Sequence, residues 1–477
     1  MNPSEKFIPT IGLEIHAELK THSKMFCSCA NDSDEEKPNA NVCPICLGHP
    51  GTLPVLNHEA IKHVLTVGIA VGGKLADFTE WDRKQYFYPD IPKGYQISQY
   101  KFPLVSDGEL SGVALERIHL EEDTAQSTHD THEKSLVNFN RAGVPLMELV
   151  TKPVIHDAAT AVRFAKELQL LLRYLGAGET NMEKGEMRVE ANISVSSPAD
   201  MKADKFGVKT EVKNLNSFRA VERAIEYEVK RQIALIEKGE KVVQETRGWD
   251  DAKNETYSQR SKESSHDYRY FPDPDIPKMK LSEIPEFSAA SLSKGMPELP
   301  WAKRDRYKKD YGMTDKEVAV FVESPLAANY FEAVIKPFKK DSKKIRLTIN
   351  YILNDYLGPA QINIELIPHA FFSELIVMIA DSEISSRGAK DLIGLLVKDN
   401  SMSPRKIAEK HGLLQKSDAA DISPIIDKVI ADNEKVVAEY KAGKTASLQF
   451  LIGHAMKEAK GAANPTVIHE LLVKKLG

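Results

Sequence analysis

The sequence predicts an α+β fold in which a large sheet domain precedes two helical parts. Alternating apolar and polar runs such as IGLEIHAEL and RVEANISV are typical of strands, and they fall within about the first 290 residues. In the same region, AATAVRFAKELQLLLRYLG and SFRAVERAIEYEVKRQIALIEKG place apolar residues at helical spacing. Strand patterns nearly vanish from about Leu299 onward, where helix is expected to follow helix.

Proline-bearing segments mark the predicted domain boundaries. FPDPDIPK, followed by IPEFSAASLSKGMPELPWAKR, indicates the exit from the sheet domain and a linker. A second break is predicted near MSPRKIAEKHGLLQKSDAADISP. We therefore expect a sheet domain over residues 1–292, a helical domain over residues 293–405 and a smaller helical tail over residues 406–477.

Composition and charge narrow the class of protein. With 42% hydrophobic and 28% charged residues among 477, the chain has the composition of a soluble globular protein. It has no apolar run long enough to span a bilayer, and its start, MNPSEKFIPTIG, lacks the features of a signal peptide, so we expect a cytoplasmic protein without membrane contact. The net charge of −5 does not favour general polyanion binding, but residues 401–477 carry twelve Lys and Arg against nine Asp and Glu. Any nucleic-acid contact is therefore expected in the tail.

All four cysteines of the chain fall in one short stretch, CSCANDSDEEKPNANVCPIC. Cys27 and Cys29 form one close pair, Cys43 and Cys46 form another, and thirteen mostly polar residues separate the pairs. This spacing is typical of tetrahedral sulfur ligation of zinc, whereas a reducing compartment disfavours disulfides. Such a site would be structural, because no position is left for a reactive water. Four free thiols in a loop are the alternative.

One predicted strand, IGLEIHAEL, projects polar side chains to one side. Alternate residues of a strand share a face, so Glu14, His16 and Glu18 point away from the apolar face. A solvated strand face is the simple alternative, but further strand-like segments of the same domain also carry acids. They supply Glu121, Glu122, Asp123, Glu148, Glu186, Glu190 and Glu211. Oxygen-rich sites with an occasional histidine suit Mg²⁺ or Mn²⁺, and Mg²⁺ commonly accompanies the phosphates of a nucleotide.

Cationic residues in the same domain are candidates for binding those phosphates. Arginine suits bidentate phosphate recognition, and lysine suits a point contact. The candidates are Arg83, Lys84, Arg141, Arg188 and Lys213. The nearest approach to a P-loop, AEYKAGKT, has Ala438 where the first glycine is required, so ATP would be held by another kind of site. The aromatic run at Tyr86, Phe87 and Tyr88 is unusual for a loop, with core packing as an equal alternative.

Several long motifs resemble those of one family, the B subunit (GatB) of aspartyl/glutamyl-tRNA(Asn/Gln) amidotransferase. They are IGLEIHAELKT, GTLPVLN, DRKQYFYPDIPKGYQISQY, NRAGVPLMELVTKP, FGVKTEVKNLNSFRAVERAIEYEVKRQ, DYRYFPDPDIP and LIGHAMKEAKGAANP. The resemblance runs nearly from end to end. It implies a glutamine-synthetase-like catalytic domain, a helical domain and a YqeY-type tail that contacts tRNA. Two features depart from the family pattern: Asn138 stands where relatives commonly carry aspartate, and the cysteine cluster is not universal.

The resemblance also implies a reaction. ATP phosphorylates the side-chain carboxylate of Glu mischarged on tRNA(Gln), or of Asp mischarged on tRNA(Asn), and ammonia then displaces phosphate to form the amide. Release of ammonia from glutamine needs an activated Cys or a Ser–Lys arrangement in a Gly/Ser-rich loop. The cysteines are assigned to zinc and we find no such loop, so a partner must supply the ammonia. The family's amidase (its A subunit), held by the small C subunit in a heterotrimer, would be that partner.

Together, these inferences assign roles to individual residues. The expected Mg²⁺ ligands are Glu14, His16, Glu122, Glu148 and Glu190, and Lys84 joins the first four as a catalytic residue. The triphosphate is expected near Arg83, Lys84, Arg141, Arg188 and Lys213, and tRNA near Lys444, Lys457 and Lys460. Two alternatives stay open: a stand-alone ligase of glutamine-synthetase type acting on a small acid, and a tRNA-binding protein without catalysis.

Overall fold

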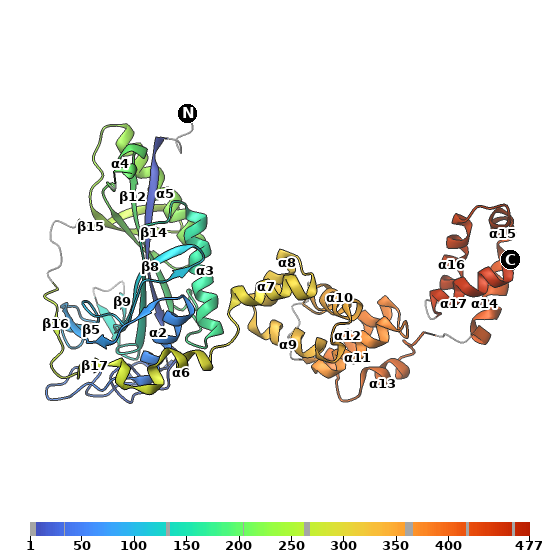
Figure 1. Ribbon diagram of the computed structural model, residues 1–477, viewed down its shortest axis with the longest axis horizontal. Coiled ribbons are helices and arrows are strands. Elements are labelled where there is room, and N and C mark those ends of the chain that lie inside the picture. The colour runs from blue at the N-terminus through green and yellow to red at the C-terminus, as the bar shows by residue number, and fades with distance from the viewer. Residues whose placement is uncertain are drawn as a thin grey trace. The chain divides into compact units, whose positions relative to one another are not determined.

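The computed structural model describes residues 6–32, 34–129, 134–203, 205–261, 268–357, 366–415, 419–459 and 463–477. The chain divides into two compact units, Met1–Pro300 and Trp301–Gly477. Every described strand lies in the first unit, and the second is helical (Figure 1). This confirms a mixed α/β sheet domain followed by a helical C-terminal region. The division into three domains with boundaries after residues 292 and 405 stays a prediction.

A ten-stranded sheet forms the centre of the first unit. Its strand order is β15-β14-β13-β12-β1-β11-β8-β6-β2, with β7 paired to β8, and the β13–β14 pair is parallel whereas the other pairs are antiparallel. The bounds are β1 Ile8–Glu18, β2 Lys74–Leu75, β6 Val105–Ser106, β7 Glu109–Leu110, β8 Val113–Glu122, β11 Pro145–Thr151, β12 Met187–Ser196, β13 Thr210–Leu215, β14 Glu245–Asp250 and β15 Glu255–Ser261.

Helices cover one face of this sheet. α3 (Ala158–Tyr174) and α5 (Phe218–Glu237) pack against each other and contact β1 and β12, respectively (Figure 1). In β1, Ile11, Leu13 and Ile15 are completely buried. Because strand side chains alternate, Glu14 and His16 project from the opposite face. The apolar residues of β1 thus fix which face of the sheet can carry a polar site.

Small elements surround the sheet. A three-stranded sheet joins β4 (Asp82–Gln85) to both β5 (Tyr95–Ser98) and β16 (Phe271–Pro272), which brings distant segments of the chain together. The other elements of this unit are α2 His58–Ala70, β3 Phe78–Thr79, β9 Gln126–His129, β10 Ser135–Asn138, α4 Pro198–Lys202, β17 Met279–Lys280 and α6 Ala289–Lys294, with 3-10 turns at Leu281–Glu283 and Pro285–Phe287.

The second unit is built from helices. Their bounds are α7 Pro300–Tyr311, α8 Asp315–Val322, α9 Pro325–Ile335, α10 Ser342–Tyr351, α11 His369–Ala380, α12 Ser386–Lys398, α13 Pro404–Lys410, α14 Ala419–Asp432, α15 Glu434–Lys441, α16 Ala446–Glu458 and α17 Pro465–Leu476, with a 3-10 turn at Lys336–Phe338 and a π-helical turn at Ile352–Tyr356. Helices α14 to α17 share a core of their own around Ile422, Leu451 and Leu472. No single described helix is long and apolar enough to cross a membrane. The bent pair Asp315–Val322 and Pro325–Phe338 reaches that length and apolar composition only when the two segments are taken together.

Candidate active site

Four side chains form a row across the polar face of the sheet. In the register of the antiparallel pairs, His119 on β8 lies opposite Glu148 on β11, Glu148 lies opposite His16 on β1, and His16 lies opposite Arg188 on β12. Directly opposed residues of neighbouring strands share a face and lie close together. The pairing of strands that are far apart in sequence therefore places one carboxylate between two imidazoles.

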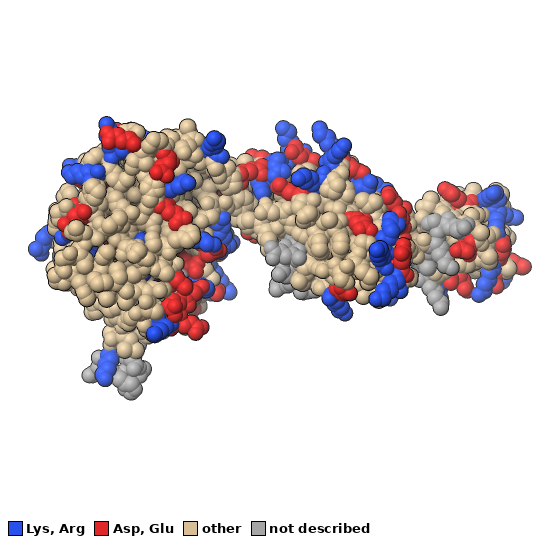
Figure 2. Space-filling model, turned by 90° about the horizontal axis from the view of Figure 1, so that it is seen from below, with Lys and Arg blue, Asp and Glu red and all other residues tan. Residues whose placement is uncertain are grey.

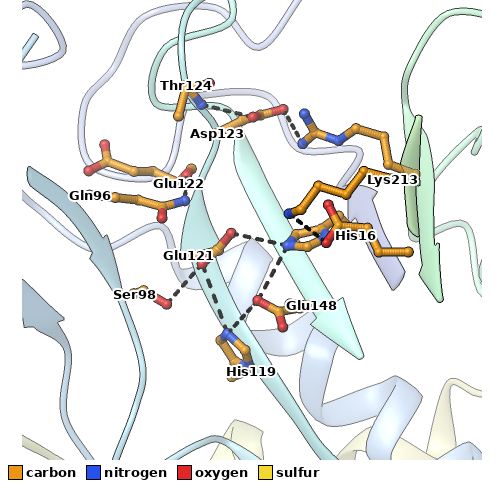
Figure 3. Close-up of polar contacts among 12 residues, drawn as sticks. His16, Gln96, Ser98, His119, Glu121, Glu122, Asp123, Thr124, Glu148 and Lys213 are labelled. Atoms are coloured by element: carbon orange, nitrogen blue, oxygen red, sulfur yellow. Dashed lines mark hydrogen bonds and ion pairs between the residues drawn. The ribbon is translucent and has the colours of Figure 1, made fainter. Parts of the chain in front are cut away.

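The first group of candidate ligands gathers around this row (Figure 3). His16 Nε2 lies 3.3 Å from Glu148 Oε2 and 3.7 Å from Glu121 Oε1. His119 Nε2 lies 3.1 Å from the same Glu148 oxygen, and Ser98 Oγ donates a hydrogen bond to Glu121 Oε2 at 2.9 Å. Ligand atoms of His16, Glu121 and Glu148 all lie within 4.8 Å of one another. This spacing allows the three side chains to bind one metal ion.

Burial and neighbouring charges shift the pKa values of His16 and Glu148 in opposite directions. Burial alone would lower the pKa of His16 and raise that of Glu148, because it disfavours both charged forms. The charge and hydrogen bond of Glu148, together with the charges of Glu121 and Glu190, outweigh burial, and the pKa of His16 is raised to about 9. Burial likewise opposes ionisation of Glu148, but the charges of His119 and His16 hold its pKa well below the ordinary value. The site therefore favours an ionised carboxylate surrounded by positive charge.

A second carboxylate group lies on the neighbouring strands. Glu14 on β1 is opposite Glu190 on β12, and Glu211 of β13 completes a set whose ligand atoms lie within 4.8 Å of one another. Burial, followed by the charges of Glu148 and Glu190, raises the pKa of Glu14. Lys213 Nζ lies 2.8 Å from Glu190 Oε2 and 3.6 Å from Glu211 Oε1, which partly balances the negative charge. This group could hold a second cation or present Lys213 to an anion.

Both carboxylate groups line a single cavity of about 550 Å³. Lys84, Arg188 and Lys213 line it as well, so cations and carboxylates face the same space. Burial would lower the pKa of Lys84, but Glu121, Tyr270 and Glu148 together outweigh burial and raise it, which keeps the ammonium charged. Arg188 Nη2 is held by Asp123 Oδ2 at 2.8 Å. A cavity with this composition suits a metal ion bound together with phosphate groups.

Two of the candidate ligands on β8 point to opposite faces of the strand. Glu121 joins the first group, whereas Glu122 accepts a hydrogen bond from Ile97 N at 2.9 Å and pairs with Lys93. Glu122 lines a separate cavity of about 230 Å³ beside Cys46. The structure thus brings Glu14, His16, Glu148 and Glu190 together around the main cavity and places the Glu122 carboxylate elsewhere.

His119 and Glu121 were not among the expected site residues. Both appear in the motif RIHLEED, and strand alternation applied to this motif places residues 119, 121 and 123 on one face. The same rule that selected Glu14 and His16 could therefore have selected Glu121 over Glu122. Nothing in the sequence indicated that His119 would lie opposite Glu148, because the strand register is set by tertiary pairing.

Two of the expected phosphate-binding arginines do not line the main cavity. Arg83 Nε lies 2.7 Å from Asp273 Oδ2, its Nη2 lies 2.9 Å from Asp275 Oδ2, and the side chain lines the 230 Å³ cavity rather than the main one. Arg141 Nε lies 3.5 Å from Asp123 Oδ2 and donates to Thr124 O at 3.1 Å. Because Asp123 lines the main cavity, Arg141 stands at its edge.

A smaller cavity of about 360 Å³ adjoins the main one. It shares Glu14 and Lys209 with the main cavity. Most of its exposed lining is apolar and includes Pro153 and Phe206, although polar residues such as Asn192 and Ser194 also line it. This cavity has the apolar character that a nucleobase or another flat apolar group requires.

Comparison with known protein families identifies the family to which the chain belongs. The profile described as the GatB/GatE catalytic domain matches residues 9–285, and the profile described as the GatB domain matches residues 329–476. The chain belongs to the GatB family. The resemblance inferred from the motifs is thereby confirmed.

Curated GatB relatives are similar along nearly their whole length, and each is named as the B subunit of aspartyl/glutamyl-tRNA(Asn/Gln) amidotransferase. The protein of Caldicellulosiruptor saccharolyticus is 44% identical over 98% of this chain and 98% of its own length. That of Gloeothece citriformis is 41% identical over 98% and 97%, respectively, and that of Thermomicrobium roseum is 41% identical over 99% of both chains.

The four cysteines of this GatB-family chain converge on one point. The sulfur atoms of Cys27, Cys29, Cys43 and Cys46 lie within 4.8 Å of one another. Cys43 N donates to Cys46 Sγ at 3.1 Å, and the buried Lys24 ammonium lies 4.0 Å from the same sulfur. Backbone N–H groups and a nearby cation stabilise thiolates, which are the form that binds metal. Four sulfur donors in this arrangement could hold a structural metal.

Asn138 helps to attach the cysteine loop. Its side-chain Oδ1 accepts hydrogen bonds from Asn39 N and Asn140 N, both at 3.1 Å. Next to it, Asn140 Oδ1 accepts from Asn41 N at 2.9 Å. These contacts connect the loop between the two cysteine pairs to β10. The side chain of residue 138 therefore acts here as a hydrogen-bond acceptor.

The lysines of the tail differ in whether an acidic side chain holds them. Lys444 Nζ is held by Glu439 Oε2 at 2.8 Å, whereas Lys457 forms no ion pair within the described part of the chain. Lys460 lies outside the described residues. Figure 2 shows Lys and Arg side chains interspersed with Asp and Glu on the visible face of the tail. The tail thus offers individual cations rather than a continuous basic surface on that face.

Proposed function

We propose that this chain is the catalytic B subunit of a tRNA-dependent amidotransferase, with a glutamine-synthetase-like catalytic domain and a tail that contacts tRNA. It would convert Glu on tRNA(Gln), or Asp on tRNA(Asn), to the corresponding amide with hydrolysis of ATP. The observation that carries the proposal is the cavity shared by two carboxylate groups and three cations in a chain of the GatB family. Carboxylates, imidazoles and cations of this kind suit the activation of a carboxylic acid by phosphoryl transfer.

The metal site of the proposed reaction consists of His16, Glu121 and Glu148. Hard carboxylate oxygens with one imidazole fit Mg²⁺ or Mn²⁺, and the three side chains meet closely enough to share one ion. Glu14 and Glu190 stand beside them as candidates for a second ion. Bound Mg²⁺ would neutralise charge on the phosphate oxygens during transfer. Glu121 takes the place expected for Glu122, because its carboxylate reaches the cavity.

Lys84, Arg188 and Lys213 would position the triphosphate. All three line the cavity, and Lys84 stays protonated because Glu121 raises its pKa against the effect of burial. Fixed cations stabilise the charge that spreads over the transferring phosphoryl group. A substrate carboxylate oxygen attacks the γ-phosphorus while the bond to the ADP oxygen breaks. The nucleoside of ATP would then lie in the adjoining cavity, which shares Glu14 and Lys209 with the main one.

The second step needs a nitrogen source and a bound tRNA. Ammonia attacks the acyl carbon of the mixed anhydride, phosphate leaves, and a proton is lost from nitrogen. We propose that an amidase (the A subunit), held by a small C subunit, delivers the ammonia, since the names of the relatives imply a complex of several proteins. Phosphate contacts from the tail, including Lys457, would hold the tRNA through sequence-independent charge.

The cysteine cluster completes the proposed set of cofactors. Four converging sulfur atoms fit the tetrahedral coordination that structural zinc prefers. The closed donor set leaves no open position, so a metal bound there would not take part in phosphoryl transfer. Its role would be to hold the loop from Cys27 to Cys46 in one conformation next to β10.

Formation of ADP in response to mischarged tRNA tests this proposal. The complete complex with Glu148→Gln should lose this activity while retaining tRNA binding, because the metal and phosphate site loses its central charge. Glu116→Gln is the matched control, since Glu116 is an exposed acid on β8 that does not line the cavity. Turnover of free glutamate would favour the stand-alone ligase, and tRNA binding without ADP formation by the wild type would favour the non-catalytic tRNA-binding protein.

A further inference from the structure

One wall of the main cavity consists of tyrosines that the proposed phosphoryl transfer does not use. Tyr86, Tyr100, Tyr268 and Tyr270 all line the cavity. The rings of Tyr100 and Tyr270 are stacked, with centroids 4.5 Å apart and planes inclined by 11°. A second stacked pair, Tyr86 and Tyr88, has centroids 5.0 Å apart and planes inclined by 4°. Flat aromatic surfaces therefore border the polar interior.

Core packing does not account for this wall. Tyr100 is 64% exposed although it lines the cavity, and Tyr88 and Phe87 are 57% and 83% exposed. Because Tyr270 covers one face of the Tyr100 ring, the exposure of Tyr100 leaves its other surfaces accessible. The Tyr100 backbone is fixed by a hydrogen bond from its N–H to Asp82 Oδ2 at 3.0 Å. An exposed but positioned aromatic ring at a cavity is typical of a stacking contact with a ligand.

The backbone beside the wall adopts an uncommon conformation. Arg269, between Tyr268 and Tyr270, has a φ of +41°. A non-glycine residue seldom adopts a positive φ, and such outliers cluster at binding sites. The segment is held because Gln85 N donates to Tyr268 O at 2.9 Å and β16 pairs with β4 directly afterwards. The chain thus maintains a strained residue between two tyrosines that line the same cavity.

The tyrosine wall also lies beside Lys84, one of the cations proposed to position the triphosphate. Lys84 Nζ lies 5.1 Å above the centre of the Tyr268 ring, and the pKa of Lys84 is raised mainly by Glu121 against burial. One lysine thus connects the carboxylate group with the aromatic wall. In the proposed substrate, the reacting carboxylate belongs to an amino acid esterified to the terminal ribose of tRNA. About eight or nine covalent bonds separate it from the terminal base, a reach of roughly 10 Å at most, so that base must lie near the cavity.

We propose that Tyr100, backed by Tyr270, is the platform on which the 3′-terminal base of the aminoacyl-tRNA stacks. This inference rests on the proposed function and names the part of the site that receives the RNA. Stacking tolerates any base and needs no hydrogen-bond code, which suits a terminus shared by different tRNAs. The adenine of ATP is the other possible source of a base. It is assigned to the adjoining cavity because that cavity meets the main one at Glu14 and Lys209, and none of the four wall tyrosines lines it.

Kinetics of the assembled complex test the platform, with ammonium chloride as nitrogen donor so that glutamine hydrolysis is bypassed. Tyr100→Ala should raise KM for aminoacyl-tRNA about tenfold, whereas KM for ATP and kcat should change less than about twofold. Tyr100→Phe retains the ring and should restore a KM near that of the wild type. Tyr257→Ala is the matched control, because Tyr257 is an exposed tyrosine on β15 that lines none of the cavities described above.

A small probe separates the platform from contacts with the body of the tRNA. The probe is 3′-deoxy-3′-glutamylamino-adenosine, a stable mimic of the terminal aminoacyl nucleotide. It should inhibit the wild type competitively against aminoacyl-tRNA and lose about tenfold in potency with Tyr100→Ala. Glutamine amide, which lacks the nucleoside, should inhibit the wild type and the Tyr100→Ala variant equally.

Three results would overturn the platform. A Tyr100→Ala complex with an unchanged KM for aminoacyl-tRNA, or with the increase confined to KM for ATP, would do so while leaving the proposed function in place. Equal losses with Tyr100→Phe and Tyr100→Ala would show that the hydroxyl rather than the ring matters. If the wild-type complex made no ADP in response to mischarged tRNA, the proposed function and the platform would both be wrong.

Discussion

His16 on β1 and Glu148 on β11 face each other across the sheet, and Nε2 of the imidazole lies 3.3 Å from Oε2 of the carboxylate. Glu148 is the only charged residue in its strand, PLMELVT, which is otherwise largely apolar and buried. An ionised carboxylate in such surroundings requires nearby positive charge. His16 and His119 supply it from the two neighbouring strands. The apolar strand and its single acid thus form the centre of the proposed site.

Substitution of the two adjacent acids of β8 should separate their roles. We expect Glu121→Gln to reduce ADP formation at least about a hundredfold, because a metal ligand in the main cavity is lost. Glu122→Gln should retain ADP formation, since its carboxylate contacts Ile97 N and Lys93 in another cavity. The measurement is tRNA-dependent release of ADP by the complete complex. Equal loss in both variants would place Glu122 back among the metal ligands.

Removal of metal from the cysteine cluster should loosen the loop that carries it. The purified protein should contain about one zinc per chain, and Cys46→Ser should lose the zinc and become more sensitive to protease between residues 27 and 46. Metal analysis and limited proteolysis measure the two effects. A fully reduced, metal-free wild-type chain with normal stability would contradict a structural zinc.

Asn138 offers a test of how the loop is attached. Asn138→Asp should be tolerated, because a carboxylate oxygen can accept the same two backbone hydrogen bonds as the amide oxygen. Asn138→Ala should lower stability by about 1 kcal/mol, since both N–H groups lose their side-chain acceptor. Thermal unfolding of the two variants, with protease sensitivity of the loop as a second readout, makes the comparison. Equivalent behaviour of Ala and Asp would show that the acceptor is unimportant.

Glu332 should make the stability of the helical unit depend on pH. Burial would raise the pKa of this carboxyl, but the hydrogen bond from Arg306 Nη2 and that from the Tyr307 hydroxyl lower it overall. A carboxyl group whose pKa is lowered by folding stabilises the fold at pH values above the ordinary glutamate pKa of 4.5. This contribution is lost as the pH falls through the folded-state pKa. Glu332→Gln should therefore destabilise the protein at pH 7 by about 1 kcal/mol, a low value because the side chain is partly solvated.

Calorimetry of the whole chain measures this effect. The difference in unfolding temperature between wild type and Glu332→Gln should shrink once the pH falls below the ordinary range of glutamate. Glu323→Gln is a suitable control, since Glu323 is an exposed acid of the same unit and forms no ion pair with the described residues. A difference that is constant with pH would mean that Glu332 acts through packing and not through charge.

Two lysines of the tail should differ in their contribution to tRNA binding. Lys457→Ala should weaken binding several-fold and reduce the slope of log affinity against log salt by about one, as expected for a lost phosphate contact. Lys444→Ala should have a smaller effect, because its ammonium is already held by Glu439. Binding of mischarged tRNA over a series of salt concentrations measures both quantities. Equal slopes in the wild type and the Lys457 variant would remove this lysine from the interface.

Features that depend on local geometry could be predicted from the sequence. Alternation along IGLEIHAEL placed Glu14 and His16 on one face, and β1 has this arrangement because strand geometry alternates side chains irrespective of the neighbours. Likewise, two close cysteine pairs joined by a short loop can meet without help from the rest of the fold. The change from strands to helices near residue 300 follows from residue patterns that are themselves local.

Contacts between distant segments were decided by the tertiary structure. The register of β8, β11 and β1 placed His119 opposite Glu148, and Glu148 opposite His16. Arg83 lines a different cavity from the main one, and the pairing of β4 with β16 brings Asp273 and Asp275 to its guanidinium. A strand pattern states which side chains share a face, but it does not state which strands become neighbours or how far they are shifted along each other. Those choices depend on the packing of the whole sheet against α3 and α5, and they determine which acids, imidazoles and cations finally face one cavity.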